Sequence, residues 1–168
     1  QAHILNQKPS VLNQFIAELR DKTVQTDAMR FRRNLERIGE IMAYEISKRL
    51  PFFFFFVPTP LGIATENVPS DKVVICSILR AGIPLQQGML NYFDKAENAF
   101  VSAYRKHTIA DDFDIHVEYI ASPSLEGKTL LLCDPMLATG SSIEMVYKAL
   151  LQKGKPKSIH LVSVVGSQ

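Results

Sequence analysis

The segment LLLCDPMLATGSSIEMV, residues 130–146, decides the fold of this chain. An unbroken apolar run ahead of Asp134 predicts a short strand over 129–133 that is buried on both faces. A loop then leads into an amphipathic helix, predicted over 141–153 and ended by Gly154. A buried strand, a short loop and a helix in this order are typical of α/β proteins.

The same pattern recurs along the rest of the chain. Residues 73–79 form another β-rich apolar run, and a turn leads from it to a helix that begins near Pro84. Strands are also predicted over 99–104 and 159–165, with weak alternation over 116–120. Buried strands that alternate with helices indicate an α/β fold with a mainly parallel central sheet flanked by helices.

An N-terminal helical segment is predicted ahead of the sheet. Ser10 is a suitable N-cap for the first helix. In the second helix, apolar residues recur at spacings of three and four between Phe31 and Ile46, and Pro51 stops it. The other face of the second helix carries four arginines, which we interpret as solvated: Arg30, Arg32, Arg33 and Arg37.

Five of the ten phenylalanines stand together at residues 52–56. A continuous aromatic run fits neither the period of a strand nor that of a helix. Two interpretations therefore stay open. The run is either a strand buried on both faces or a surface that contacts another subunit.

Size and composition fit one soluble domain. The chain has 168 residues and a formal net charge of +2, which is too small to indicate a nucleic-acid partner. Cys76 and Cys133 lie inside apolar runs, and we interpret them as buried hydrophobes without a disulfide or metal role. With no signal segment and no run long enough to cross a bilayer, we expect a cytoplasmic protein without a membrane partner.

The loop after Asp134 has the chemistry of an anion site. Backbone N–H groups of residues 138–142 lie at the predicted helix start, where the positive end of the helix dipole gathers. Gly140 lets the backbone approach a ligand closely. Hydroxyl donors are added by Thr139, Ser141 and Ser142. This arrangement suits a phosphate monoester, although it is not a nucleotide P-loop, and a capped helix start without a ligand is the alternative.

Asp134 itself is suited to a sugar. A carboxylate only accepts hydrogen bonds, so it repels a phosphate and binds hydroxyl groups. A phosphate next to sugar hydroxyls describes a ribose 5-phosphate group. Two further loops, at 80–82 and from Arg105 onward, also follow predicted strands, and the carboxyl ends of such strands are where α/β sheets bind ligands.

Residues 134–142, DPMLATGSS, resemble the phosphoribosyl diphosphate (PRPP) signature of uracil phosphoribosyltransferases. Members of the wider type I phosphoribosyltransferase fold usually carry two acids at its start, whereas the uracil enzymes carry Asp-Pro, as here. The family usually has Gly-Gly where this chain has Gly140 and Ser141. Similar phrases cover nearly the whole chain: SILRAG at 77–82, GML at 88–90, YR at 104–105, FRRNLERIGEIMAYE at 31–45 and TPLG at 59–62.

The resemblance implies a type I phosphoribosyltransferase-like fold and transfer of phosphoribosyl from PRPP to uracil, which yields UMP and diphosphate. By the same resemblance, Arg80 and Arg105 bind the diphosphate, helped by the backbone of Ala81 and Gly82, and Asp134 holds the ribose hydroxyls. Arg80, Arg105 and Asp134 are thus the expected catalytic residues. The remaining PRPP-binding positions are Pro135, Met136, Leu137, Ala138, Thr139, Gly140, Ser141 and Ser142.

Further expectations follow from the resemblance. Mg²⁺ is expected to arrive bound to PRPP, so no protein metal ligands are predicted. Residues 106–114 are a candidate lid, within which we interpret His107 as solvated. We expect a homodimer or a higher homo-oligomer.

The base-reading residues are unknown from this sequence. In the family, the uracil-reading segment with its Gly-Asp phrase follows the last strand, and no equivalent precedes Gln168. We therefore expect one phosphoribosyltransferase domain over 1–168 that lacks this segment. Two alternatives remain open: a regulatory protein that binds PRPP without turnover, and a phosphoribosyltransferase for another base.

Overall fold

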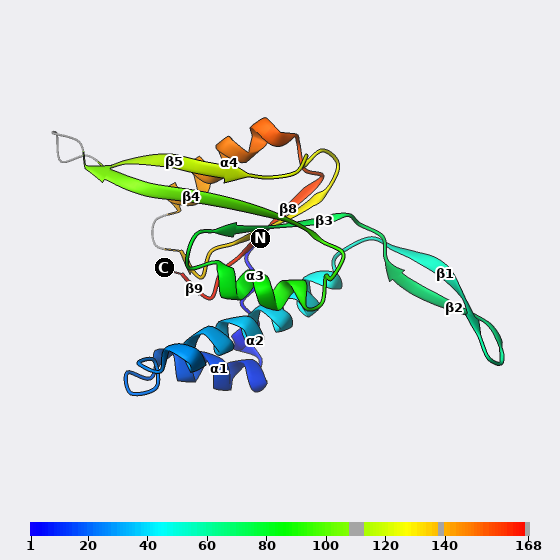
Figure 1. Ribbon diagram of the computed structural model, residues 1–168. Helices are drawn as coiled ribbons and strands as arrows, with labels where there is room; N and C mark the ends of the chain where they lie inside the picture. The colour runs from blue at the N-terminus through cyan, green and yellow to red at the C-terminus, as the bar shows by residue number, and fades with distance from the viewer. Residues whose placement is uncertain (108–112, 138–139, 167–168) are drawn as a thin grey trace.

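The computed structural model describes residues 1–107, 113–137 and 140–166. Its centre is a five-stranded sheet in the order β5-β4-β3-β6-β8 (Figure 1). The strands are β3 (Val73–Ile78), β4 (Glu97–His107), β5 (Phe113–Ala121), β6 (Thr129–Cys133) and β8 (Ser158–Val162). All neighbours run parallel except β5, which is antiparallel to β4. The predicted α/β fold with a mainly parallel sheet is confirmed.

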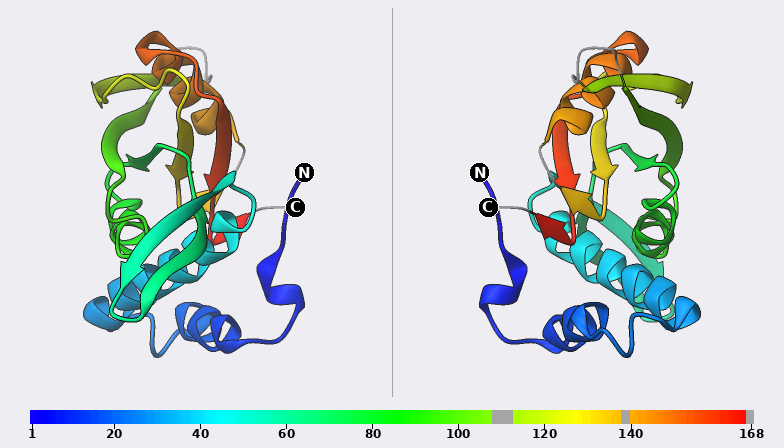
Figure 2. Two further views of the ribbon diagram at one scale, coloured as in Figure 1. Left: turned by 90° about the vertical axis from the view of Figure 1, so that its right-hand side faces the viewer. Right: turned by 90° about the vertical axis from the view of Figure 1, so that its left-hand side faces the viewer.

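Helices cover both faces of this sheet (Figure 2). On one face lie α1 (Val11–Arg20), α2 (Ala28–Ser47) and α3 (Ile83–Leu90), and on the other lies α4 (Ser141–Leu150). Short 3₁₀ turns span η1 (Leu5–Gln7) and η2 (Leu151–Lys153). The predicted cap of α1 is confirmed, since Ser10 Oγ accepts a hydrogen bond from the Leu12 amide at 3.2 Å. No helix in the described part of the chain is long and apolar enough to span a membrane.

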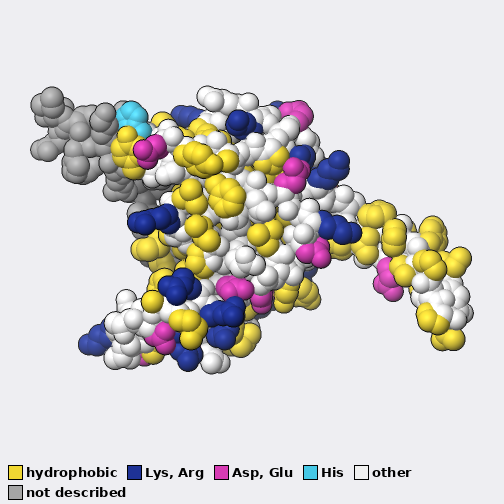
Figure 3. Space-filling view, viewed as in Figure 1, with side chains coloured by type: hydrophobic (Ala, Val, Ile, Leu, Met, Phe, Trp, Pro, Cys, Tyr) yellow, Lys and Arg dark blue, Asp and Glu magenta, His cyan; other side chains and the backbone are white. Residues whose placement is uncertain are grey.

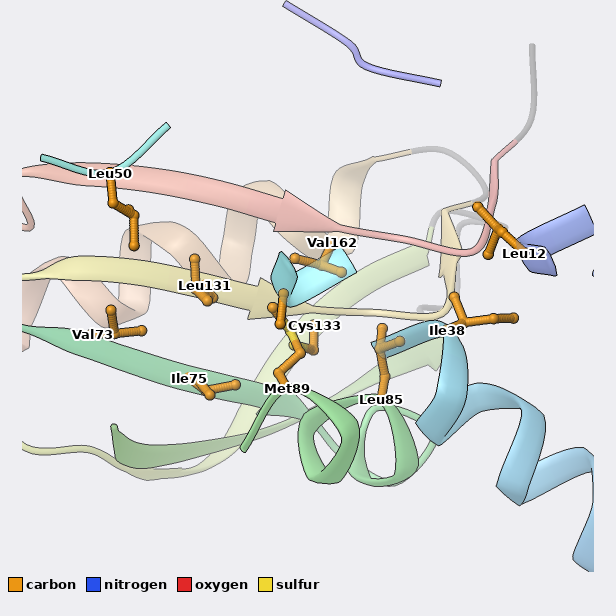
Figure 4. Packing of buried hydrophobic residues seen from close by; sticks show 11 residues of the cluster. Leu12, Ile38, Leu50, Val73, Ile75, Leu85, Met89, Leu131, Cys133 and Val162 are labelled. Carbon is orange, nitrogen blue, oxygen red and sulfur yellow. The ribbon is translucent and has the colours of Figure 1, made fainter. Parts of the chain in front are cut away.

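Alternate residues of β3 and β6 point into two separate cores. Ile75, Leu131 and Cys133 pack with Leu85 and Met89 of α3, as Figure 4 shows. The intervening residues, among them Val74, Cys76, Leu130 and Leu132, pack toward α4. Burial on both faces explains why these strands read as unbroken apolar runs.

The two cysteines are the buried hydrophobes that the sequence predicts. Burial raises the pKa of the Cys76 thiol to about 12, and it raises the pKa of Cys133 as well. Both thiols therefore stay protonated and unreactive near neutral pH.

The phenylalanine run lies on an arm that leaves the body of the molecule. β1 (Phe52–Thr59) and β2 (Gly62–Pro69) form an antiparallel hairpin that projects to the right in Figure 1. The interpretation as a strand buried on both faces is wrong, because all five rings are at least 43% exposed. A two-stranded hairpin has no third layer to cover its faces, and apolar side chains gather along the arm in Figure 3.

Several strand boundaries differ from those predicted. β4 continues to His107 and β5 begins at Phe113, so both ends of the predicted polar stretch 105–114 belong to strands. Antiparallel pairing of the two backbones outweighs the low β-propensity of these polar residues. The last predicted strand is broken, because β8 ends at Val162 and β9 (Val165–Gly166) pairs instead with β7 (Met136–Leu137).

Candidate active site

The turn after β3 packs directly against the end of β6. A β-carbon added at Gly82 would lie 2.6 Å from Ser77 Oγ, 2.7 Å from the Cys133 carbonyl oxygen and 2.8 Å from that of Ile78. No side chain fits in that space, so only glycine allows this approach. The predicted diphosphate turn and Asp134 are thereby brought to the same edge of the sheet.

Within the turn, backbone hydrogen bonds hold the start of α3. The Gly82 amide donates to the Ile78 carbonyl at 3.0 Å, and the Ile83 amide donates to the Arg80 carbonyl at 3.2 Å. The Leu79–Arg80 peptide bond is cis. The Arg80 side chain is exposed at the sheet edge, and it forms no ion pair with any residue of the described ranges. Its guanidinium is therefore available for an anion.

Asp134 is held at the carboxyl end of β6 by its own backbone. Its amide donates to the Val162 carbonyl at 3.0 Å, and its Oδ1 accepts from the Met136 amide at 3.2 Å. The side chain is half-buried, and this burial raises the pKa of the carboxyl group despite the bond from Met136. One carboxylate oxygen is thus engaged with the backbone of the loop.

Pro135 anchors the loop that follows. It is buried, and its carbonyl accepts from the amides of Val164 and Val165 at 3.1 and 2.9 Å. Met136 is exposed and Leu137 half-buried, and both lie in the short β7 strand. The segment after β8 therefore fixes the path of the predicted phosphate loop.

The loop ends where α4 begins at Ser141. Gly140 is the N-cap with φ of +76°, a left-handed conformation that L side chains rarely adopt. Glycine at this position cannot cap the helix with a side chain, so a bound anion is a suitable partner for the first amides of α4. Ser141 is exposed and Ser142 half-buried at the same helix start. The chain has Ser141 where the family usually has a second glycine. This difference is compatible with the turn, because the left-handed residue is Gly140.

Three of the predicted site residues are described in part or not at all. Ala138 and Thr139 lie outside the described residues, and so does the centre of the candidate lid, 108–112. The backbone of Arg105 lies in β4 opposite Ile115, and its side chain is not described. The structure therefore brings together Arg80, Ala81 and Gly82 with Asp134, and leaves the contribution of Arg105 as a prediction.

Sequence reasoning overlooked Ser77 as a separate feature. Its side chain is fully buried beneath Gly82, and its Oγ has no hydrogen-bond partner among the described residues. The available signal was a single polar residue inside the apolar run 73–79. Such a residue in a buried strand normally has a specific hydrogen bond.

The donor groups at the edge fit a metal that arrives with its ligand. Within the described ranges, no three His, Cys, Asp or Glu side chains are grouped so that they could hold a metal. Mg²⁺ is typically bound through one or two carboxylates, several waters and the phosphates of a substrate. A carboxylate such as Asp134 at this edge is consistent with that mode.

Comparison with known proteins points to one family. The uracil phosphoribosyltransferase family profile matches residues 6–168. A uracil phosphoribosyltransferase of Porphyromonas gingivalis is 59% identical over 164 residues, which are 98% of this chain and 76% of that protein. The protein of the same name from Pyrobaculum arsenaticum is 37% identical over 155 residues, covering 90% of this chain and 72% of its own length.

Solved structures share the fold. A protein from Aquifex aeolicus superposes with a TM-score of 0.83 at 26% identity, over 95% of this chain and 74% of its own. A hypoxanthine phosphoribosyltransferase from Staphylococcus aureus superposes with a TM-score of 0.57 over 79% of this chain and 63% of its own. Because its identity is 14%, this second likeness shows the fold alone.

Proposed function

This chain belongs to the uracil phosphoribosyltransferase family, and on that premise we propose how the edge between Arg80 and Asp134 carries out the reaction. The chain is a phosphoribosyltransferase, which transfers phosphoribosyl from PRPP to uracil and yields UMP and diphosphate. One observation supports the assignment of roles: Gly82 packs against the Cys133 carbonyl, so that the exposed Arg80 and the half-buried Asp134 share one edge. In PRPP the diphosphate and the ribose are joined at C1. A cation for the diphosphate and a carboxylate for the ribose hydroxyls must therefore lie close together.

Arg80 binds the diphosphate in this proposal. Negative charge grows on the diphosphate as its bond to C1 breaks, and a fixed cation stabilises that charge more in the transition state than in the ground state. Arg105 supplies a second cation from the end of β4. The backbone of Ala81 and Gly82 is proposed to assist this binding.

Asp134 accepts hydrogen bonds from the ribose hydroxyls. Loss of diphosphate leaves an oxocarbenium-like ribose, and a neighbouring carboxylate stabilises this positive charge. A ring nitrogen of uracil then bonds to C1 and loses its proton to water or to the departing diphosphate, so no covalent intermediate with the protein forms. The turn from Pro135 to Ser142 binds the 5-phosphate at the start of α4.

Magnesium is proposed to enter with PRPP. When bound, Mg²⁺ neutralises charge on the diphosphate and so makes it a better leaving group. Asp134, half-buried at the end of β6, is the carboxylate that would contact it. The residues that contact uracil remain unassigned, and the cytoplasm stays the predicted location.

The direct test is product formation by the protein. With labelled uracil, PRPP and MgCl₂, we expect UMP and diphosphate in equal amounts, measured by chromatography. Hypoxanthine and orotate in parallel reactions are expected to give no nucleotide. Binding of PRPP without turnover of any base would contradict the enzyme and favour the regulatory alternative, and turnover of another base alone would contradict uracil as the substrate.

We propose that the β1–β2 arm contacts a second copy of this chain in a homodimer or a higher homo-oligomer. Phe54 and Phe56, on one face of β1, are 71% and 67% exposed, and the five-residue apolar stretch carries no charge. Apolar surface of this extent on an arm away from the body is typical of an interface. In a subunit contact, the second copy covers these rings and removes them from water. It thus takes the place of the covering layer that a two-stranded hairpin does not have.

Replacing both Phe54 and Phe56 by serine is expected to weaken self-association by about two to four orders of magnitude. Each buried ring contributes about 1.5–3 kcal/mol, and tenfold corresponds to about 1.4 kcal/mol. Sedimentation velocity measures the change. Tyr92→Ser is the matched control, because Tyr92 is a 55% exposed ring outside the arm. An unchanged oligomer in the double variant contradicts the proposed interface.

A further inference from the structure

Gln86 is a buried polar side chain that ties a helix to the central sheet. It is 3% exposed and lies on the side of α3 that faces the sheet. Its Nε2 donates to the Ile75 carbonyl of β3 at 3.0 Å and to Asn98 Oδ1 of β4 at 3.3 Å. A side-chain amide nitrogen carries two hydrogens, so both of them are used. One side chain therefore joins α3 to two neighbouring strands.

The same helix carries the proposed diphosphate turn at its start. Gly82 is the N-cap of α3, and its carbonyl accepts from the Gln86 amide at 2.9 Å. Gln86 thus lies one helical turn from Gly82, and hydrogen-bonded helical backbone joins the two. A shift of α3 along its axis, or a rotation about it, therefore moves the turn and Arg80 as well.

The turn has little freedom on the side of the sheet. A β-carbon added at Gly82 would lie 2.7 Å from the Cys133 carbonyl oxygen, so the turn cannot move closer to β6. Movement in other directions is opposed by the contacts that hold α3 on the sheet. Leu85 and Met89 supply apolar contacts, visible in Figure 4, and such contacts have no preferred direction. The hydrogen bonds of Gln86 have preferred distances and angles, so they resist sliding and rotation of the helix.

The two strands that Gln86 joins lead to the two predicted cations. β3 ends ahead of Arg80, and β4 continues through Arg105. Ile75 and Asn98 are direct neighbours in the β3–β4 register, so both bonds meet at one level of the sheet. The bonds from Gln86 therefore hold α3, and the turn at its start, in a fixed position relative to both strands.

We infer that Gln86 is a positioning residue for the transferase reaction, which holds the diphosphate turn and Arg80 in place relative to β4. Ile75 precedes the carboxyl end of β3, where PRPP is proposed to bind, so Gln86 acts through the turn and not by contact with the ligand. This inference rests on the proposed function, since it assumes that diphosphate binds at the turn.

Gln86→Met is expected to weaken binding of magnesium diphosphate and to raise KM for PRPP, each by about tenfold, which is less than the about hundredfold effect of a 1 Å misplacement. Methionine is unbranched and adapts to the same space, but it removes both hydrogen bonds. The KM for uracil is expected to be maintained. Because the Ile75 carbonyl loses a donor, the melting temperature is expected to fall by a few degrees. Calorimetry, and steady-state kinetics well below that temperature, measure the changes.

Asn34→Leu is the matched control for the loss of stability. Asn34 is likewise a buried amide, and it joins α2 to α1 through a bond to Glu18 at 2.7 Å. Its replacement is expected to lower the melting temperature by a similar amount without changing diphosphate affinity. An equal loss of diphosphate affinity in Asn34→Leu and Gln86→Met attributes the effect to stability and overturns the role of Gln86.

Asn98→Ala separates the bond to β4 from folding stability. Asn98 is exposed, so its replacement is expected to leave the melting temperature unchanged. Diphosphate affinity is expected to fall by about threefold, between the wild type and Gln86→Met, because one of the two bonds is lost. Wild-type affinity in Asn98→Ala overturns the role of this bond.

A double-mutant cycle with Arg80→Ala tests whether Gln86 acts through the turn. Because Arg80 is the group that is positioned, Gln86→Met is expected to lower kcat/KM for PRPP by less than about threefold in the Arg80→Ala background, against about tenfold in the wild type. Independent, multiplicative losses overturn the positioning role.

Failure of this inference is distinguishable from failure of the proposed function. Equal diphosphate affinity and equal KM for PRPP in the wild type and Gln86→Met overturn the role of Gln86 and leave the proposed function intact. Absence of both diphosphate binding and UMP formation in the wild type overturns the proposed function itself.

Discussion

Arg80→Ala is expected to lower kcat/KM for PRPP by about two to three orders of magnitude, the effect of removing one preorganised donor from a transition state. Arg80 is exposed at the sheet edge without an ion pair in the described ranges, so alanine removes a cation that the fold itself does not use. The melting temperature is therefore expected to stay within a few degrees of the wild type. Steady-state kinetics with PRPP varied at saturating uracil measure the loss.

Arg32→Ala is the matched control for this change. Arg32 is likewise exposed, on α2, and carries the same charge away from the sheet edge. Arg32→Ala tests whether a fall in kcat/KM reflects the loss of one positive charge alone. We expect kcat/KM for PRPP to be unchanged in this variant. Unaltered turnover in Arg80→Ala would remove Arg80 from the diphosphate site.

Asp134→Asn is expected to lower kcat about a hundredfold while keeping the shape of the site. The amide oxygen of asparagine still accepts from Met136, whose amide lies 3.2 Å from Oδ1. The negative charge that is proposed to face the ribose is lost. Kinetics at neutral pH measure the effect, and Asp94→Asn, an exposed carboxylate in the loop after α3, is the control. Full activity in Asp134→Asn would contradict the electrostatic role.

The pH profile gives an independent test of Asp134. Burial raises its pKa above the ordinary 3.8 of aspartate. In the proposed mechanism only the ionised form is active. In the wild type, kcat/KM for PRPP, which reports the ligand-free protein, is therefore expected to fall on acidification through a pKa higher than that of an exposed aspartate. Asp134→Asn is expected to lack this acid limb, because asparagine does not titrate. A wild-type profile that is flat down to the ordinary aspartate range would contradict the assignment.

Stability is expected to change in the opposite direction to activity. A folded-state pKa above the unfolded value means that protonated Asp134 favours folding at low pH, and that this contribution is lost as pH rises through the folded pKa. Asparagine resembles the protonated form at every pH. Asp134→Asn is therefore expected to melt above the wild type at neutral pH and close to it in acid, as calorimetry can measure.

The phenylalanine run shows the limit of local patterns. Apolar continuity predicted burial correctly for Thr129–Cys133 and failed for Phe52–Phe56, although both stretches lie in strands. β6 has a strand on each side and helices on both faces, whereas β1 has only β2 as a neighbour. An apolar segment predicts that its burial lowers the free energy. It does not predict whether the surface that covers it belongs to the same chain or to another one.

The sequence by itself determined the α/β class, the buried parallel strands and the family, because periodicity, glycines and the Asp134–Pro135 phrase act over a few neighbouring residues. Only the tertiary structure decided which groups meet at the sheet edge. The contact of Gly82 with the Cys133 carbonyl depends on the parallel pairing of β3 with β6, two segments far apart in the sequence. Such geometry follows from how twisted strands pack, and no local pattern encodes it.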